Sequence, residues 1–428
     1  MDKTIKPIES IRGEIEVPGD KSISHRAVFL GGISRGKTEA HNFLEAEDCL
    51  HSVSAFRAMG IEISLKEKTI IINGAGLRGL KKPEKALYLG NSGTTMRILP
   101  GILAGQNFEA TLTGDESLNK RPMARIVEPL SKMGVSISSR DARGLPPLVV
   151  KGGPVKPVEY DTKAASAQVK SCVLFAGLYP AGETVLREAC QSRDHTERML
   201  EFFGAQIKKE KLFTKVNGNQ ELNGRDFFIP GDISSAAFFM VAACMLEGSD
   251  ITIREVGLNP TRMGLADVLE SMGADIQIKR AKKAIEPYGD IRIRFAPLKG
   301  TTVEKEKIPL LIDEIPVLAV LAASAEGETC IKGAGELRVK ETDRIFSISE
   351  NLKRLGAEIT SRGENLIIKG SGRRFRKSRL ESFADHRTAM AMSVAALLAD
   401  GECTIKNIDC VNTSFPGFFD MLGYLKKV

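Results

Sequence analysis

Hydrophobic and polar residues recur along the chain in a pattern with two parts. The first part is a run of small and apolar residues that ends in Gly and leads into alternating apolar and polar residues, as in "ACMLEGSDITIREV". The second part is a run with one apolar helical face, closed by Gly, before another alternating segment, as in "ESMGADIQI". Helical spacing followed by alternation indicates a helix and then a half-buried strand. Each pair of parts therefore predicts an α/β unit.

This pattern repeats about six times. The glycines that close the second part stand at positions 60, 134, 204, 273, 356 and 423, the last in the truncated "MLGYLKKV", so the repeat is about 70 residues long. Gly is favoured just past a helix end, which explains its fixed place. Chance recurrence is the alternative, but six matched pairs in order are hard to obtain from composition alone. At 428 residues the chain is also longer than one hydrophobic core usually supports. We expect six α/β units, three in each of two domains.

Two unit openings match especially well. "EVPGDKSISHRAVFLGG" (16–32) and "IPGDISSAAFFMVAACML" (229–246) both run from a strand through Pro-Gly-Asp into an apolar helix. They are expected to occupy equivalent positions in the two domains.

Composition narrows the class of protein. With 42% hydrophobic and 27% charged residues the chain is typical of a soluble globular protein. Its longest apolar run, 236–246, is too short to cross a bilayer, and the N-terminus lacks a signal-peptide core, so we expect a cytoplasmic protein with no membrane partner. The seven cysteines lack C-x-x-C spacing and are interpreted as reduced packing residues.

The net charge of +7 leaves a nucleic-acid-binding repeat protein as an alternative of another class. Its positive residues are dispersed, however, and there is no Trp to interleave with them. Small acidic substrates fit this charge distribution better than nucleic acid.

Polar and charged residues gather at six expected strand-to-helix junctions, where helix N-termini favour anions. The segment "LGNSGTTMR" (89–97) is one of them. For another, "NKRPMARI", we expect a helix that Pro122 begins, with Arg121 and Arg125 one turn apart. Taken singly, each segment fits a cap or a solvated helix face, but recurrence at one point of the repeat favours a cationic pocket for phosphate or carboxylate groups. The junction residues are Lys21, Ser22 and Arg26; 91–97; Arg121 and Arg125; Ser166 and Gln168; Lys340, Glu341 and Arg344; and Asp385, His386 and Arg387.

Two acids lie among these cations. Asp313 stands before the apolar run "IPVLAVLAA", and Glu341 stands between Lys340 and Arg344. Each is a candidate for general acid or base work, because a carboxylate in a cationic pocket otherwise repels an anion. The alternatives are an N-cap for Asp313 and charge balance for Glu341.

Metal and nucleotide chemistry find no support in the sequence. His25, His195 and His386 are too scattered for a metal set, and no Walker A or G-x-G-x-x-G motif is present. We expect neither a metal nor a cofactor.

Together these segments resemble the 5-enolpyruvylshikimate-3-phosphate (EPSP) synthases over nearly the whole chain. The strings that carry the resemblance are "PGDKSISHR", "GNSGTTMR", "GDESLNKRPM", "SAQVKS", "DEIPVLAV", "RVKETDR" and "DHRTAMA". The resemblance implies a two-domain inside-out α/β barrel of six βαβαββ-like repeats, three per domain. Residues 1–17 plus 231–428 would form a discontinuous domain and 18–230 an inserted one, joined by two crossovers near the Pro-Gly-Asp segments.

The reaction that the resemblance implies is transfer of the enolpyruvyl group of phosphoenolpyruvate (PEP) to the 5-hydroxyl of shikimate 3-phosphate, with release of phosphate. This is a step of the shikimate pathway to chorismate and the aromatic amino acids, and it is the target of glyphosate in sensitive members of the family. The resemblance also implies a cytoplasmic monomer whose partners are its small-molecule substrates.

Roles for single residues follow from the resemblance alone. The shikimate 3-phosphate residues would be Lys21, Ser22, Arg26, Ser166, Gln168, Ser192, Asp313 and Lys340. The PEP residues would be Lys21, Asn91, Gly93, Arg121, Gln168, Arg344 and Arg387. Asp313 and Glu341 would share the proton transfers, with Lys21 as an alternative acid, and the sequence leaves open which acid performs which step.

The sequence also departs from the better-known enterobacterial and plant pattern. It has Ala167 between Ser166 and Gln168, and the family's contacts at His195, Glu336 and Thr413 are altered, so these three are not counted as site residues. Such features resemble the second class of the family. The nearest enzymatic alternative is the sister transferase that acts on UDP-N-acetylglucosamine, which typically carries a reactive Cys in the loop that corresponds to "GDESLNKRPM". This loop has no Cys.

Overall fold

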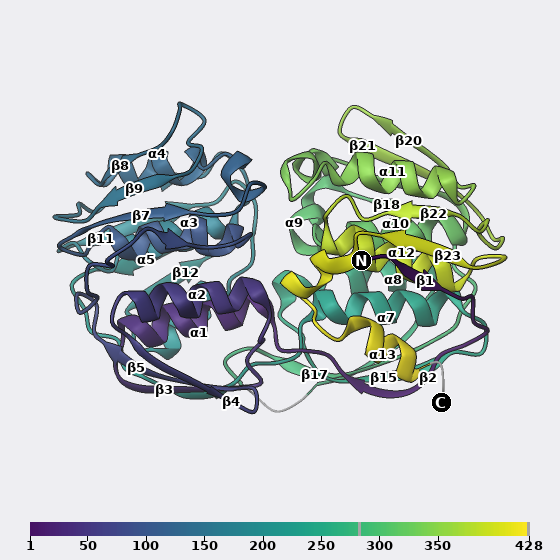
Figure 1. Ribbon diagram of the computed structural model, residues 1–428, viewed down its shortest axis with the longest axis horizontal. Coiled ribbons are helices and arrows are strands. Elements are labelled where there is room, and N and C mark those ends of the chain that lie inside the picture. The colour runs from purple at the N-terminus through teal and green to yellow at the C-terminus, as the bar shows by residue number, and fades with distance from the viewer. Residues whose placement is uncertain (281–283, 426–428) are drawn as a thin grey trace. The chain divides into compact units, whose positions relative to one another are not determined.

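The computed structural model describes residues 1–280 and 284–425 (Figure 1). The chain divides into two units. One is discontinuous and comprises Met1–Pro18 with Pro230–Val428, and the other is the inserted segment Gly19–Ile229. We refer to them as the discontinuous unit and the inserted unit. None of the described helices is long and apolar enough to cross a membrane.

The inserted unit contains three repeats of helices and strands. Their elements in order are α1 (Lys21–Ile33), β3 (Arg35–His41), α2 (Glu47–Ala58), β4 (Glu62–Lys66), β5 (Thr69–Ala75), β6 (Leu87–Tyr88), α3 (Gly93–Leu103), β7 (Glu109–Thr113), the 3-10 helix η1 (Leu118–Lys120), α4 (Ala124–Lys132), β8 (Ser136–Ser138), β9 (Leu148–Lys151), β10 (Glu159–Asp161), α5 (Ala167–Ala176), β11 (Glu183–Arg187), α6 (His195–Phe202), β12 (Ile207–Glu210), β13 (Phe213–Asn217) and β14 (Asp226–Phe228).

The discontinuous unit begins with two strands of the N-terminus and continues after residue 229. Its elements are β1 (Lys3–Ile5), β2 (Arg12–Glu16), α7 (Ile233–Met245), β15 (Asp250–Gly257), η2 (Pro260–Arg262), α8 (Gly264–Met272), β16 (Asp275–Arg280), β17 (Tyr288–Arg294), β18 (Thr302–Val303), η3 (Lys305–Lys307), α9 (Ile308–Leu311), α10 (Ile315–Ser324), β19 (Glu326–Ile331), η4 (Ala334–Val339), α11 (Arg344–Arg354), β20 (Glu358–Arg362), β21 (Asn365–Ser371), β22 (Arg379–Glu381), α12 (His386–Leu397), β23 (Cys403–Lys406), η5 (Ile408–Thr413) and α13 (Phe418–Leu425).

The sheets confirm the repeat that the hydrophobic pattern predicts. Within the described residues, five four-stranded sheets share one strand order, and a sixth sheet has three strands. In each of the five the first two strands are parallel and the remaining pairs are antiparallel. The orders are β14-β3-β5-β4, β6-β7-β9-β8, β10-β11-β13-β12, β2-β15-β17-β16 and β18-β19-β21-β20, with β22-β23-β1 as the sixth.

The two Pro-Gly-Asp segments occupy equivalent places, as predicted. β2 precedes α1 in sequence but pairs with β15, and β14 precedes α7 but pairs with β3, so each crossover leaves its strand in one unit and begins a helix in the other. Asp20 accepts a hydrogen bond from the Ile23 N–H (2.9 Å), and Asp232 accepts one from the Ser234 N–H (2.8 Å). An aspartate therefore caps both helices and satisfies one of their free N–H groups.

The repeat glycines behave as expected at five of the six positions. Gly60, Gly134, Gly204, Gly273 and Gly356 follow helices and have φ between 82° and 100°. The prediction for Gly423 is wrong, because this residue lies inside α13 and ends no helix.

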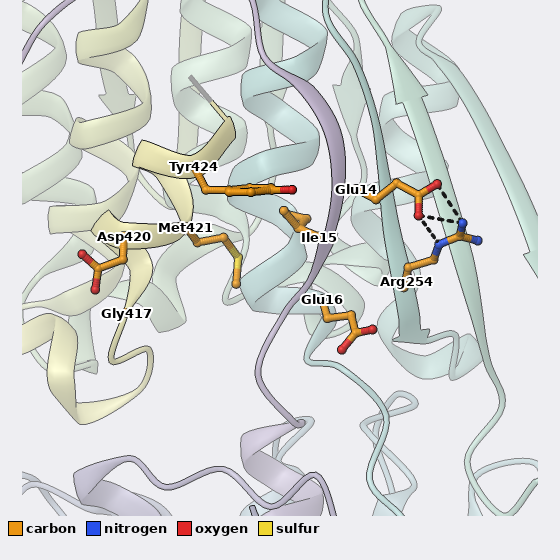
Figure 2. Close-up of a pocket in the computed structure, with 8 residues that line it drawn as sticks. All are labelled: Glu14, Ile15, Glu16, Arg254, Gly417, Asp420, Met421 and Tyr424. Atoms are coloured by element: carbon orange, nitrogen blue, oxygen red, sulfur yellow. Dashed lines mark hydrogen bonds and ion pairs between the residues drawn. The ribbon is translucent and has the colours of Figure 1, made fainter. Parts of the chain in front are cut away.

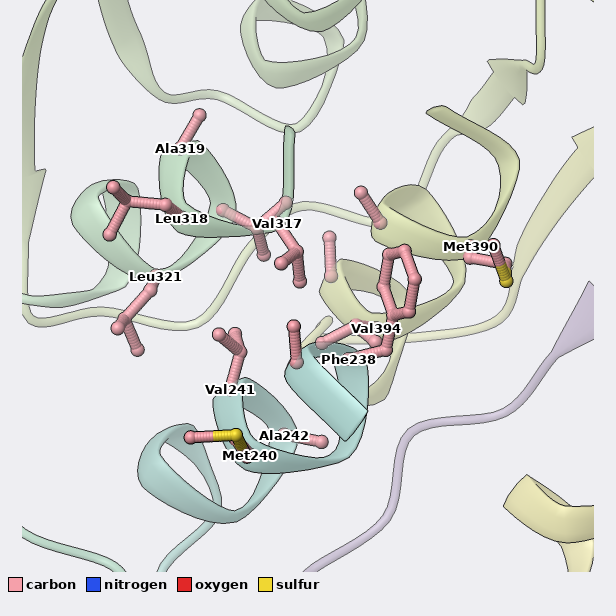
Figure 3. Packing of buried hydrophobic residues seen from close by; sticks show 14 of the residues in the cluster. Phe238, Met240, Val241, Ala242, Val317, Leu318, Ala319, Leu321, Met390 and Val394 are labelled. Carbon is pink, nitrogen blue, oxygen red and sulfur yellow. The ribbon is translucent and has the colours of Figure 1, made fainter. Parts of the chain in front are cut away.

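Three helices form the centre of the discontinuous unit (Figure 3). Every residue of α7 and α12 is buried, and Phe238 of α7 lies among side chains of α10 and α12 such as Val317 and Val394. A helix that is apolar on all sides requires burial all round. The strands around these helices bury alternate residues only, as β15 does. Helices inside and sheets outside make this an inside-out α/β fold.

Close backbone approach joins two helices of the inserted unit. A Cβ added to Gly101 of α3 would lie 2.1 Å from the carbonyl oxygen of Cys172 in α5. Only glycine leaves room for this contact. The separation of α3 and α5 matters because their first turns carry several of the predicted site residues.

Gly101→Ala should therefore destabilise the protein by about 1–3 kcal/mol, the usual cost of overpacking a core. Urea unfolding followed by circular dichroism measures this loss. Gly153→Ala is the matched control, because a Cβ at Gly153 meets nothing within 4 Å. Equal unfolding midpoints for the two variants would show that α3 and α5 adjust without strain.

Candidate functional site

The first turn of α1 carries the first group of predicted residues. The Lys21 Nζ atom lies 3.0 Å from the Asp48 carboxylate, and Ser22 follows in the same turn. Arg26 is buried one turn later, and its guanidinium donates to the Ser22 carbonyl (2.9 Å). It also donates to the Thr196 hydroxyl (2.6 Å) and the Ser171 hydroxyl (2.8 Å). The structure thus brings Lys21, Ser22 and Arg26 together at one helix end.

A buried chain of hydrogen bonds links this helix to the start of α3. His25 Nδ1 lies 2.7 Å from the Ser52 hydroxyl, Ser52 lies 2.7 Å from the Thr95 hydroxyl, and Thr95 lies 2.8 Å from the Ser92 hydroxyl. Burial lowers the pKa of His25 well below its ordinary value, and the Lys21 and Arg26 cations act in the same direction. His25 is therefore neutral, and it helps to fix where α3 begins.

The N-terminus of α3 gathers three of the residues predicted to bind PEP. The Arg121 guanidinium donates to the side-chain oxygen and to the carbonyl of Asn91, and Asn91 Nδ2 donates to Asp115 (2.7 Å). A Cβ added to Gly93 would lie 3.2 Å from Arg121 Nη1. Asn91, Gly93 and Arg121 are therefore neighbours, and glycine leaves space for two guanidinium groups, since the Cβ would also lie 2.9 Å from Arg97 Nη1.

Two of the six segments do not lie directly between a strand and a helix. Arg121 follows η1 with an extended backbone, and α4 begins only at Ala124, so the helix predicted from Pro122 is wrong. A residue before proline avoids the helical region, and Arg121 uses its guanidinium to bind Asn91 and Ser117 instead. Lys340 and Glu341 likewise come after η4 rather than after a strand.

The first turn of α5 lies next to that of α3. Ser166 is the N-cap of α5 and accepts from the Val169 N–H (3.4 Å). Gln168 accepts from Arg97 (3.1 Å) and donates to the Thr94 hydroxyl (3.2 Å), so its amide joins the two helices. Arg97 belongs to the predicted junction segment 91–97 but was given no specific role, although its place one helical turn after Gly93 is the signal that could have assigned one.

Ser192 lies between β11 and α6, where its hydroxyl and its backbone N–H both donate to Glu188 Oε1. The structure therefore sets this side chain as a hydrogen-bond acceptor toward any further partner. A serine hydroxyl has one proton and two lone pairs, and the proton is already directed at a carboxylate.

The discontinuous unit builds its cluster around Arg344, which is 1% exposed at the start of α11. Its guanidinium donates to Glu341 (2.6 Å), Asp385 (2.8 Å) and Asp313 (3.3 Å). Burial alone would lower the pKa of Arg344, but these carboxylates outweigh it and raise the pKa above its ordinary value. Arg344 is therefore a permanent buried cation.

Asp313 lies in the turn between α9 and α10 with its side chain 17% exposed. Its carboxylate also lies 3.5 Å from Arg387 Nε, and Arg387 donates to its backbone carbonyl (3.1 Å). The N-cap of α10 is Glu314, so the alternative of Asp313 as a helix cap is wrong. Asp313 instead lies against two guanidinium groups.

Lys340 and Glu341 complete this cluster. Glu341 is 24% exposed and Lys340 is partly buried. Removal from water lowers the pKa of the Lys340 ammonium; the Asp313 carboxylate opposes this shift, and the Arg344 guanidinium adds to it. The residues left out of the predicted site lie in α6 (His195), η4 (Glu336) and η5 (Thr413).

A pocket of about 570 Å³ lies elsewhere in the discontinuous unit, between β2 and α13 (Figure 2). It contains no predicted site residue. Glu14 pairs with Arg254 (2.7 Å), whereas Glu16 and Asp420 add negative charge to its lining. An anionic ligand is repelled by such a surface, so this pocket is not the candidate site. Its lining residues are Glu14, Ile15, Glu16, Arg254, Gly417, Asp420, Met421 and Tyr424.

The part of the chain that the structure describes offers no arrangement of side chains suited to a metal ion. No group of three or more His, Cys, Asp or Glu residues there is arranged to hold an ion.

Comparison with known proteins places the chain in a family. The model of the family described as EPSP synthase (3-phosphoshikimate 1-carboxyvinyltransferase) matches residues 5–422. The 3-phosphoshikimate 1-carboxyvinyltransferase of Desulforamulus reducens is 50% identical over 424 residues, covering 99% of both chains. That of Citrifermentans bemidjiense is 48% identical and covers 98% of both.

Solved structures agree. The EPSP synthase of Acinetobacter baumannii superposes with a TM-score of 0.88 at 44% identity, covering 99% of this chain and 98% of that one. The enolpyruvyl transferase NikO of Streptomyces tendae, at 18% identity over 99% and 96% of the two chains, shares the fold with a TM-score of 0.77. With the family model spanning nearly every described repeat, the chain belongs to the EPSP synthase family, the 3-phosphoshikimate 1-carboxyvinyltransferases.

Proposed function

We propose that the predicted site residues act on two substrates, shikimate 3-phosphate and PEP. As a member of this family the chain is an enolpyruvyl transferase of the shikimate pathway. It moves the enolpyruvyl group of PEP to the 5-hydroxyl of shikimate 3-phosphate and releases phosphate. The observation that carries the residue assignment is the placement of two partly exposed carboxylates, Asp313 and Glu341, on one buried guanidinium, Arg344.

The chemistry requires groups that move protons. Addition of a hydroxyl across the PEP double bond needs a proton on the methylene carbon and loss of a proton from the attacking oxygen, and the resulting tetrahedral intermediate then expels phosphate. Asp313 and Glu341 are the proposed acid and base, with Lys21 as an alternative acid. Salt bridges to Arg344 hold both carboxylates in fixed positions, which general acid and base catalysis demands.

The remaining residues bind and orient the substrates. Cations and helix N-termini suit phosphate and carboxylate groups. Because its proton is directed at Glu188, Ser192 is proposed to accept a hydrogen bond from a ring hydroxyl of shikimate 3-phosphate. We assign to shikimate 3-phosphate Lys21, Ser22, Arg26, Ser166, Gln168, Ser192, Asp313 and Lys340, and to PEP Lys21, Asn91, Gly93, Arg121, Gln168, Arg344 and Arg387.

Both substrates are small phosphorylated metabolites. We propose that the enzyme meets them in the cytoplasm as a monomer, with neither nucleic acid nor a membrane as partner. The dispersed positive charge of the sequence supports the exclusion of nucleic acid.

Phosphate release should require shikimate 3-phosphate and PEP together, and EDTA should leave the rate unchanged. A coupled phosphate assay measures both. UDP-N-acetylglucosamine in place of shikimate 3-phosphate is the control for the sister reaction. Turnover with the nucleotide sugar, or loss of activity with the chelator, would contradict the proposal.

Replacing either acid should slow catalysis more than it weakens binding. Glu341→Gln and Asp313→Asn should each lower kcat by about 10²–10⁴, the usual contribution of a positioned acid or base. The KM for PEP should change only a few-fold. Glu350→Gln, on the exposed face of the same helix as Arg344, is the matched control. A variant of Glu341 or Asp313 with kcat close to that of the wild type would restrict that residue to charge balance.

Lys340 should make substrate capture sensitive to high pH. Its pKa is lowered, so the ammonium loses its charge at a lower pH than a free lysine does, and kcat/KM for shikimate 3-phosphate should fall as the pH rises through that value. Lys340→Arg keeps the charge and should move this fall to higher pH. Rates from neutral pH to about pH 10 test it, because the ordinary pKa of a lysine lies just above that range. Identical profiles for the two proteins would exclude Lys340 as the titrating group.

A further inference from the structure

A wholly buried lysine of the inserted unit has no role in the scheme above. Lys170 of α5 is 0% exposed, and its Nζ atom lies 2.8 Å from Glu188 and 2.7 Å from Glu197. Both glutamates are also buried. Burial lowers the pKa of Lys170, but the two carboxylates outweigh this effect and raise it, so the lysine is charged.

The three charged residues come from three different segments. Lys170 belongs to the first turns of α5, Glu188 directly follows β11, and Glu197 lies in the first turn of α6. The Lys170 backbone N–H also donates to the carbonyl of Ser166 (3.0 Å). The lysine therefore ties the turn that carries Ser166 and Gln168 to the two segments that flank Ser192.

The first of these connections ends on Ser192. Glu188 Oε2 accepts a hydrogen bond from Lys170 Nζ, and Glu188 Oε1 accepts from both the hydroxyl and the backbone N–H of Ser192. The lysine holds the carboxylate, and the carboxylate fixes which way the serine hydroxyl points. Its lone pairs are thereby left for a hydroxyl of the substrate.

The second connection ends on Arg26. Lys170 and Glu197 are each next in sequence to a residue that binds this arginine, namely Ser171 and Thr196. The Ser171 and Thr196 hydroxyls also lie 2.6 Å from each other. The Lys170–Glu197 ion pair and the adjacent contact between the Ser171 and Thr196 hydroxyls therefore both connect α5 to α6. The two hydroxyls accept hydrogen bonds from the Arg26 guanidinium.

Buried ion pairs are weak evidence for stability, because desolvation offsets their attraction, and fixed geometry is a recognised alternative reason for them. Here the first turn of α5 carries Gln168 after its N-cap Ser166, and Glu188 binds Ser192. The third segment, α6, carries no assigned residue itself but contributes Thr196, which binds Arg26. We propose that Lys170, acting through Glu188 and Glu197, is a positioning residue for the shikimate 3-phosphate site, setting Ser192 as an acceptor and Arg26 as a fixed cation. This inference rests on the substrate assignment of the proposed function.

The variant Glu188→Gln tests the first connection in the full-length enzyme. An amide must turn its oxygen toward the Lys170 ammonium, so its NH₂ group faces Ser192 and reverses the hydrogen bond. We expect the Kd of shikimate 3-phosphate, from calorimetry without PEP, to rise at least about tenfold, because a hydrogen-bond partner is left unmet. The KM for PEP should stay within about threefold, since this connection reaches no residue assigned to PEP alone.

Lys170→Met removes the ammonium that contacts both glutamates, and it should weaken shikimate 3-phosphate binding at least as much as Glu188→Gln does. If this variant does not fold, Glu188→Gln and the following double variant still decide the proposal. Glu188→Gln combined with Ser192→Ala should bind no more weakly than the weaker-binding single variant, because the carboxylate acts through the serine. Glu183→Gln, on β11 with an exposed partner in Lys215, is the matched control and should bind as the wild type does.

Two outcomes overturn the proposal. One is a Kd of shikimate 3-phosphate for Glu188→Gln within twofold of the wild-type value. The other is a double variant whose fold-increase in this Kd equals the product of the fold-increases of the two single variants. A general loss of structure would lower the active fraction and the urea midpoint without splitting the shikimate 3-phosphate Kd from the PEP KM. Failure of the wild type to bind shikimate 3-phosphate would instead refute the proposed function, and the proposal with it.

Discussion

A helix that is apolar on every side can be stable only where other elements surround it, and this constraint determines where polar chemistry can occur in the fold. In the discontinuous unit α7, α10 and α12 satisfy it by packing against one another inside the sheets. Their side faces offer nothing to a polar ligand. The first turn of a helix can bind a polar ligand, because N–H groups there lack helical partners and polar residues cap them.

The clusters follow from that constraint in both units. Asp385 caps α12 and at the same time binds Arg344, so the residue that begins a core helix also anchors the buried cation. Ser92 caps α3 and ends the hydrogen-bond chain from His25. Polar contacts near the helix starts are thus shared between folding and the candidate site. We infer that few of these residues can be replaced without altering both.

The sequence predicted those parts of the structure that depend on local pattern. Gly273 closes α8 in the left-handed conformation because a helix followed by a strand requires such a turn, and the same pattern recurs along the chain. The pairing of strands that lie far apart in the sequence was harder to predict. The strand β2 looks from its position like the start of the unit that contains α1, and only the resemblance to a known family indicated that it belongs with the C-terminal half. Proline permits a helix start without requiring one, which is why the helix expected at Pro122 begins later.

Among the site residues, the sequence could identify the charged groups but not their partners. Lys170 stood inside the string "SAQVKS" without a predicted role, because its counter-charges lie 18 residues away at Glu188 and further on at Glu197. Arg97 was visible but unassigned for the same reason, since Gln168 reaches it from another helix. Burial and pairing depend on the whole fold, whereas charge and spacing can be read from a short segment.

The contacts described above for the arginines differ between the two units. Within the inserted unit, the guanidinium groups of Arg26 and Arg121 donate to hydroxyl, amide and carbonyl oxygens. Arg344 is instead held by three carboxylates, which more than cancel its charge. Carboxylates fixed on a buried cation suit proton transfer, because their positions are set before the substrate arrives. We infer that Asp313 and Glu341, which are partly exposed, are the carboxylates of this cluster best suited to handling protons.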